Sequence, residues 1–211
     1  MKLFQKARPE PAAARLLLHI GCGQEAIPCW VNIDSRKLPG VNRVLDVRQG
    51  LPFQQVAAIY AEHFLEHLSL EEGLAFLREC RRALAADGML RLSTPNLDWV
   101  FASHYRFGQQ ISDDERVVDC FRLIRAFHGW GHQFLYNTSM LSAALRASGF
   151  AVVRFRRYGD SDEPLMRGLE RHETWVDTED FPHVLIAEAS GRASEPDPLP
   201  EELIGEFLEA I

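Results

Sequence analysis

The 211-residue chain is poor in cysteine, has no excess of basic residues and contains no long apolar run, and each shortage excludes a class of protein. Its 4 cysteines form no Cys-x-x-Cys pair and no repeated metal-ligand spacing, which predicts reduced thiols in a cytoplasmic protein. Its 23 basic and 30 acidic residues give a formal charge of −7, which argues against a surface that neutralises nucleic-acid phosphates. No apolar run reaches the length of a membrane span, and the first, Leu16 to Ile20, is too short and too late for a signal peptide.

The composition predicts one α/β domain, because 46% hydrophobic and 25% charged residues suffice for a substantial core. We expect a leader over residues 1–14, a domain over 15–189, and a proline-containing linker with an amphipathic helix over 190–211. The apolar face of that helix fits docking onto its own domain. Binding to a partner protein or to a second copy of the chain is the alternative.

Apolar runs and turn residues alternate along the chain and predict its elements. Strands are expected over 15–20, 31–34, 43–46, 56–60, 89–94, 150–156 and 183–189, and helices over 69–85, 113–127 and 138–148. Residues 61–68 have helical spacing, and Ser69 is the expected N-cap of the helix that follows. Repeated strand-then-helix cycles predict a mostly parallel sheet covered on both faces. An irregular excursion over 159–182 suggests that the last strand is antiparallel.

A glycine turn after the first strand is the most informative local feature. The apolar run ends in Gly21-Cys22-Gly23, and the next strand ends in the acid Asp34. Glycines without Cβ atoms let a ligand approach the backbone, and an acid at the neighbouring strand end can accept hydrogen bonds from two ribose hydroxyls. The pattern therefore indicates a nucleoside site. The alternative is an ordinary connecting turn with Asp34 as a strand-end residue.

In order and spacing, these elements together resemble the class I S-adenosylmethionine-dependent methyltransferases over about residues 15 to 189. More narrowly, they resemble a small bacterial branch of predicted methyltransferases of the type 11 kind. The residues that carry the resemblance are His19-Ile20-Gly21-Cys22-Gly23, Asp34, Asp46, Leu51-Pro52-Phe53, the run from Ile59 to Leu68, Leu84 to Leu92, and Ser148-Gly149-Phe150.

The resemblance implies a Rossmann-like, seven-stranded sheet of order 3-2-1-4-5-7-6, with S-adenosylmethionine bound over the carboxyl ends of the strands. Open parallel sheets independently place ligands at that edge. In this family the glycine turn borders the amino-acid end of the cofactor, the acid after the second strand binds the ribose, and the residues after the third strand border the adenine. The cofactor-binding residues so implied are Gly21, Cys22, Gly23, Asp34, Asp46, Val47, Glu62 and His63.

Three histidines are candidates for the catalytic base. Methyl transfer from a sulfonium needs aligned reactants and, for a hydroxyl acceptor, removal of its proton, so we expect no metal. His63 follows the fourth strand, where the family places groups that face the acceptor, and His67 comes one helical turn later. His132 lies in a glycine- and aromatic-rich loop. For each, a structural hydrogen-bonding role is the alternative.

The loop from His128 to Tyr136 is also a candidate acceptor wall or lid. Its Trp130 and Tyr136 could stack on a sugar or aromatic acceptor, or could pin the loop to the core, while Asn96 could contact the acceptor or cap a turn. The excursion contains the carboxylates of Asp160, Asp162 and Glu163 and, further on, His172 and Glu173. Their spacing matches no familiar metal-ligand set and favours a solvated acidic loop.

Two residues depart from the wider family. His19 stands where many members have an acid, so a contact that orders the ammonium end of the cofactor could be lost. Glu25 stands where a third glycine is common, and it could crowd the site or replace that contact. The sequence therefore predicts methyl transfer to a small molecule, such as a sugar hydroxyl. A catalytically silent accessory or scaffolding protein of this fold is the alternative. A nicotinamide-dependent enzyme is disfavoured because the third glycine and a Tyr-x-x-x-Lys pair are missing.

Overall fold

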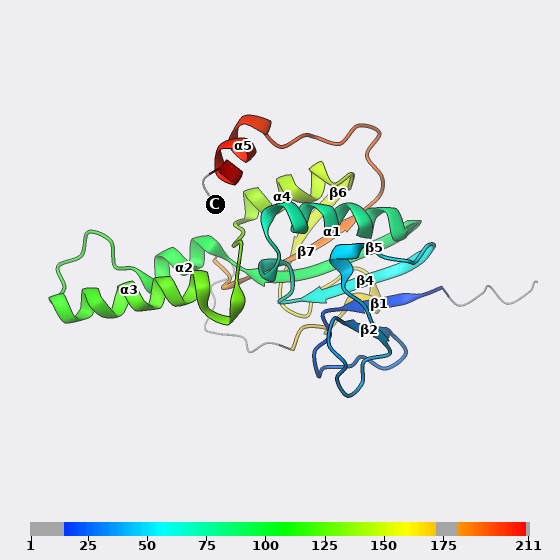
Figure 1. The fold of residues 1–211 in the computed structure, drawn as a ribbon, viewed down its shortest axis with the longest axis horizontal. Coiled ribbons are helices and arrows are strands. Elements are labelled where there is room, and N and C mark those ends of the chain that lie inside the picture. Colours follow the sequence, from blue (N-terminus) through cyan, green and yellow to red (C-terminus); the bar gives the residue numbers. More distant parts are fainter. Residues whose placement is uncertain (1–14, 172–180, 210–211) are drawn as a thin grey trace, which may run out of the picture.

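A seven-stranded sheet forms the centre of the computed structural model, which describes residues 15–171 and 181–209 (Figure 1). The predicted leader and the residues His172 and Glu173 lie outside the described residues. In chain order the elements are β1 (Leu17–Ile20), β2 (Val31–Asp34), β3 (Arg43–Val44), η1 (Val47–Gln49), β4 (Val56–Glu62), η2 (Leu65–His67), α1 (Leu70–Ala83), β5 (Leu84–Pro95), α2 (Leu97–His104), α3 (Asp113–His128), η3 (Gly129–Gly131), α4 (Thr138–Ala147), β6 (Val152–Arg156), η4 (Pro164–Met166), β7 (Val184–Ser190) and α5 (Glu201–Glu209).

The strand order is β3-β2-β1-β4-β5-β7-β6, as the sequence predicts. Strands β1 to β5 pair in parallel, and β7 runs antiparallel to both β5 and β6. The order reverses at β1, where β2 lies on one side and β4 on the other. In an open sheet this switch point is where the loops after the strands separate and leave a crevice.

The boundaries of α1 and β5 correct the predicted helix over 69–85. Ser69 does cap α1 with a full capping box, but the helix ends at Ala83 and β5 begins at Leu84. Leu84 has an extended backbone and pairs with Val56, so pairing with the sheet takes over where helical spacing alone would continue. A register shift separates this first pair from the regular ladder that begins at Met89.

Other predicted boundaries also change. Residues 61–68 are not a helix, because Ala61 and Glu62 extend β4 and only the short η2 is helical. The predicted strand over 43–46 stops at Val44, because Asp46 becomes the N-cap of η1. The helix α2 was not predicted, and Asn96 caps its first turn.

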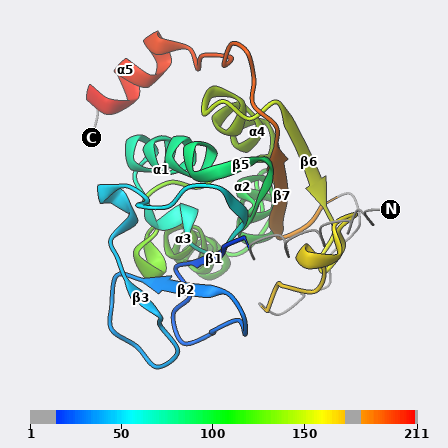
Figure 2. The ribbon, with the colours of Figure 1, turned by 90° about the vertical axis from the view of Figure 1, so that its right-hand side faces the viewer.

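Helices α1 and α4 cover one face of the sheet, while α2 and α3 extend beyond the end of β5 (Figures 1 and 2). The larger core cluster joins this helical layer to the sheet, with Ile59, Phe76 and Leu145 almost fully buried. On the other face, Trp30 from the β1–β2 crossover and Met166 from η4 pack against Tyr60 of β4. The crossover itself contains no helix, which leaves a short path from the glycine turn to Asp34.

A buried ionic cluster fixes the excursion after β6 to the sheet. Arg91 of β5 is fully buried, and its guanidinium donates to Glu170 and to Glu188, with both N···O distances 2.6 Å. Glu188 also accepts from Arg156 at 2.7 Å, and Glu170 accepts from the Gly159 amide at 3.1 Å. Asp160, Asp162 and Glu163 of this excursion are exposed, as expected for a solvated acidic loop, while the buried Glu170 and Glu188 anchor the excursion to the sheet.

The tail contacts the domain at several points, since Leu199 packs against the larger core cluster and the Ala193 amide donates to the Gly149 carbonyl at 3.0 Å. The Phe207 ring of α5 lies 5.6 Å from the Phe134 ring, measured between centroids. Within the part of the chain that the structure describes, no helix has both the length and the apolar character needed to cross a bilayer.

Candidate functional site

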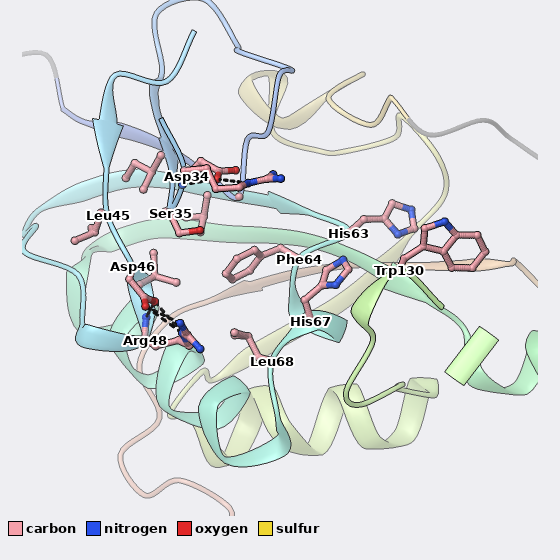
Figure 3. A pocket seen from close by; sticks show the side chains of 15 residues that line it. Asp34, Ser35, Leu45, Asp46, Arg48, His63, Phe64, His67, Leu68 and Trp130 are labelled. Carbon is pink, nitrogen blue, oxygen red and sulfur yellow. Dashed lines mark hydrogen bonds and ion pairs between the residues drawn. The ribbon is translucent and has the colours of Figure 1, made fainter. Parts of the chain in front are cut away.

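A cavity of about 400 Å³ opens at the switch point of the sheet (Figure 3). The ends of β1 and β2, the segment around η1 and the segment from β4 to η2 form its walls. Its volume is within the usual range for small-molecule sites, roughly 300 to 1,000 Å³. Figure 3 shows the carboxylates of Asp34 and Asp46 toward one end of the cavity and the rings of His63 and Trp130 toward the other.

Gly21 lines the cavity in a conformation that favours glycine. Its φ is +65°, and a Cβ at this position would lie 3.1 Å from Cγ of Phe64 and closer still to the ring edge. Cys22 and Gly23 do not belong to the described lining. Cys22 is buried and its amide donates to the Ile33 carbonyl. Gly23 contributes to the cavity only through Asp34, because the Gly23 amide donates to the Asp34 carboxylate at 3.0 Å.

Asp34 is buried, and hydrogen bonds hold its carboxylate in place. Burial would raise its pKa, but hydrogen bonds from the amide and guanidinium of Arg36 and from the Gly23 amide outweigh burial and hold the pKa below its usual value. The Arg36 amide lies 2.9 Å and its Nε 3.2 Å from Oδ1 of Asp34. The Arg36 side chain is 70% exposed, so the guanidinium is the replaceable partner of this carboxylate.

Asp46 and Val47, which the resemblance to the family places beside the adenine, both line the cavity next to Leu45. The guanidinium of Arg48 donates to Asp46 and lowers its pKa, and the Asp46 carboxylate also accepts from the Arg48 amide as the cap of η1. Val47 is buried and supplies an apolar wall.

Glu62 and the two departures from the family pattern do not belong to the described lining. The Glu62 carboxylate accepts from the Arg171 amide at 2.7 Å. Glu25 pairs with the Arg171 guanidinium at 3.4 Å, so it joins the excursion to the glycine turn instead of crowding the cavity. His19 is buried, its ring nitrogen lies 3.1 Å from the Asn32 side-chain oxygen, and burial lowers its pKa.

His63 lies at the open end of the cavity with an unusual backbone. Its φ is +45°, and strained non-glycine conformations of this kind collect at functional sites. Its Nδ1 is 2.9 Å from Oε1 of the buried Glu66. Burial would lower the pKa of His63, but the Glu66 carboxylate outweighs burial and the net effect is a raised pKa.

A second cavity of about 590 Å³ adjoins the first. Most of its lining was not identified from the sequence, because α2 was not predicted and no motif singled out Arg122, Arg125 or His183. The described lining contains two arginines, four histidines and two tryptophans but no carboxylate. These residues are Arg122, Arg125, His63, His104, His132, His183, Trp99 and Trp130. An overall acidic chain thus has a basic, aromatic cavity.

His63 and Trp130 line both cavities and mark their junction. Trp130 also has a positive φ, 58°, and the Arg125 guanidinium lies 4.6 Å from the centre of its ring. The loop that carries Trp130 is fixed to η2, since the Gln133 amide donates to the Glu66 carbonyl at 2.7 Å. The structure therefore brings His63, His67 and His132 to one region: His67 lines the first cavity and His132 lines the second.

Tyr136 and Asn96 have structural positions. Tyr136 is fully buried against the core, so it does not stack on a ligand, and its backbone forms a bridge with Asn96. The Asn96 side chain caps α2 and donates to the Pro182 carbonyl at 2.8 Å.

Solved methyltransferase structures share this fold. A SAM-dependent methyltransferase from Archaeoglobus fulgidus is 17% identical with a TM-score of 0.53, and the match covers 84% of this chain and 86% of that one. A second from Mesorhizobium loti is 18% identical with a TM-score of 0.51, covering 82% and 90%. The complex of DhpI with SAH is 14% identical with a TM-score of 0.50, covering 85% and 77%. The chain has the class I methyltransferase fold. No family model and no curated protein matches the sequence.

Proposed function

We propose that the protein transfers a methyl group from S-adenosylmethionine to a hydroxyl of a small molecule. The observation that carries the proposal is the pair of adjoining cavities, one ending at a strand-end carboxylate and both meeting at His63 and Trp130. Two of the similar structures are named SAM-dependent methyltransferases, and the DhpI structure is a complex with SAH.

The first cavity would hold the cofactor. Asp34 would accept hydrogen bonds from the two ribose hydroxyls, which would displace the exposed Arg36 guanidinium while the Gly23 amide keeps the carboxylate in place. Asp46, Val47 and Leu45 would border the adenine, and Gly21 with Phe64 the amino-acid part. The methyl group would then lie at the junction of the cavities.

The second cavity would hold the acceptor. Trp99 and Trp130 offer ring faces for a sugar or another ring, and Arg122 with Arg125 offers charge for an acidic group. We therefore favour an acceptor that carries both a hydroxyl and an acidic group, such as an acidic sugar. In the transfer its oxygen forms a bond to the methyl carbon while the carbon–sulfur bond breaks, leaving the electron pair on sulfur.

His63 is the proposed catalytic base, which would take the hydroxyl proton of the acceptor, because its side chain borders both cavities. His67 and His132 each line one cavity only, so they are weaker candidates for contact with both reactants. The main task of the remaining residues is to align donor and acceptor.

Calorimetry with S-adenosylhomocysteine tests the cofactor site. The wild-type protein should bind one ligand per chain, and Asp34→Ala should weaken binding about 10- to 150-fold, because hydrogen bonds to a charged group contribute roughly 1.5 to 3 kcal/mol. Arg36→Ala is the matched control and should bind at least as well as wild type, since its guanidinium competes for Asp34. No binding by wild-type protein, or equal binding by Asp34→Ala, would contradict the proposal.

Transfer of a labelled methyl group to paired acceptors tests the second cavity. Each acidic sugar is compared with its neutral counterpart, and the acidic member should have the higher kcat/KM. Arg125→Ala should raise the KM for acidic acceptors and leave neutral ones unchanged. If both members of each pair had the same kcat/KM, the proposal that the acceptor carries an acidic group would be wrong.

A further inference from the structure

Three side chains that commonly ligate metals converge beside the junction of the two cavities. They are Glu66 and His67 of η2 and His132, which follows η3. Their nearest ligand atoms all lie within 4.8 Å of one another. Glu66 is fully buried and both histidines are half-buried, so the group is unlike the exposed acidic clusters common on protein surfaces.

Backbone carbonyls orient both histidine rings. Nδ1 of His132 lies 2.8 Å from the Ala126 carbonyl oxygen, and Nδ1 of His67 lies 3.3 Å from that of Gly131. A carbonyl only accepts hydrogen bonds, so each Nδ1 carries the proton and the lone pair of the neutral ring is on Nε2. Among the described residues neither Nε2 has a hydrogen-bond partner. Metal-bound histidines are typically held in this way.

The Glu66 carboxylate lacks a permanently charged partner among the described residues. Its Oε1 is bonded to Nδ1 of His63, and its Oε2 accepts from the Thr94 hydroxyl at 3.0 Å. A buried carboxylate is costly unless a cation compensates it, and each of its oxygens can accept a second partner. A metal ion between Glu66 and the two histidines would supply that charge.

We propose that Glu66, His67 and His132 bind one divalent zinc-like ion at the boundary of the two cavities. Two imidazole nitrogens and one carboxylate oxygen are a donor set of catalytic zinc sites, which keep a further position open. His67 faces the first cavity and His132 the second, so the open position would be available to an acceptor oxygen. This role rests on the proposed function: the ion would favour loss of the hydroxyl proton to the catalytic base before the oxygen takes the methyl group.

Titration of the EDTA-treated, full-length protein with Zn²⁺ alone tests the site, because it needs neither cofactor nor acceptor. One ion per chain should bind, and His67→Ala and His132→Ala should each weaken binding at least tenfold. His104→Ala is the matched control: His104 lines the second cavity outside the cluster, and its substitution should leave Zn²⁺ binding unchanged. His67→Asn, checked by circular dichroism, repeats the test in a polar side chain of similar shape.

Co²⁺ absorption distinguishes this site from zinc bound by the exposed Cys29 or Cys120. Binding by nitrogen and oxygen gives ligand-field bands without a thiolate charge-transfer band. No saturable binding, thiolate bands, or binding that survives both histidine substitutions would overturn the proposal. If S-adenosylhomocysteine binds but Zn²⁺ does not, only the proposed metal site is wrong. If Zn²⁺ binds but S-adenosylhomocysteine does not, the proposed function is wrong and the metal site is supported.

Discussion

Glu170→Ala should destabilise the protein strongly, because it removes one of the carboxylates that compensate the buried Arg91 cation. Both side chains of the pair are 0% exposed, and the Arg91 Nε lies 2.6 Å from Glu170. Removing one partner of a buried ion pair typically costs about 3 to 5 kcal/mol. For a chain of this length that loss corresponds to a fall in Tm of about 6 to 20 °C. Thermal and urea unfolding followed by circular dichroism measure both quantities.

Arg15→Ala is the matched control for this loss. The Arg15 and Asp87 side chains form an ion pair while 48% and 67% exposed, so the substitution should leave stability nearly unchanged. The Glu170 substitution should also weaken cofactor binding, because Glu170 anchors the segment whose Arg171 contacts Glu62 and Glu25. A loss of less than about 1 kcal/mol in Glu170→Ala would refute the view that this cluster holds the excursion.

Three further outcomes are expected. Gly21→Ala should lower the free energy of unfolding by about 1 to 2 kcal/mol because of the positive φ of Gly21. It should also weaken binding of S-adenosylhomocysteine, because the new Cβ would collide with Phe64. Gly108 has a similar φ but no neighbouring atom near the position of a Cβ, so Gly108→Ala should lose stability only. Asparagine tolerates the left-handed backbone, so His63→Asn should lower kcat about 100-fold or more with little change in cofactor affinity. A kcat equal to that of wild type in His63→Asn would exclude a catalytic role. The pKa of Asp34 is lowered in the folded state, so the wild-type protein should lose stability relative to Asp34→Asn as the pH falls below about 4. If the free energies of unfolding of the two proteins changed in parallel across that pH range, the contacts assigned to Asp34 would be contradicted.

The sequence predicts the positions of most strands and of Asp34 because these depend on local signals, whereas the strand order follows from the resemblance to class I methyltransferases. Each buried strand is a short apolar run, and Ser69 with Glu72 specifies where α1 begins. The start of β5 at Leu84 could not be predicted in the same way, because residues that continue a helical pattern instead pair with Val56 across the sheet. Helix α2 lacks a single apolar face, since Phe101 is exposed and only Val100 is buried.

Only the part of the candidate site that lies in local sequence motifs was predicted. Gly21 and Asp34 lie in a recognisable motif, but Glu66 resembles an ordinary helix-start acid in the sequence. Its bond to His63 is local, but its approach to His132 depends on tertiary contacts between η2 and the loop after α3. The basic character of the second cavity likewise depends on where α2 and α3 bring Arg122 and His104.

A crystal structure with S-adenosylhomocysteine would test the proposed cofactor site most directly. The expected result is a ligand in the first cavity with both ribose hydroxyls within hydrogen-bond distance of Asp34 and its sulfur beside His63 and Trp130. The Arg36 guanidinium should then have left the Asp34 carboxylate. A cavity without ligand at saturating concentration, or a ligand bound elsewhere while Arg36 still donates to Asp34, would contradict the assignment.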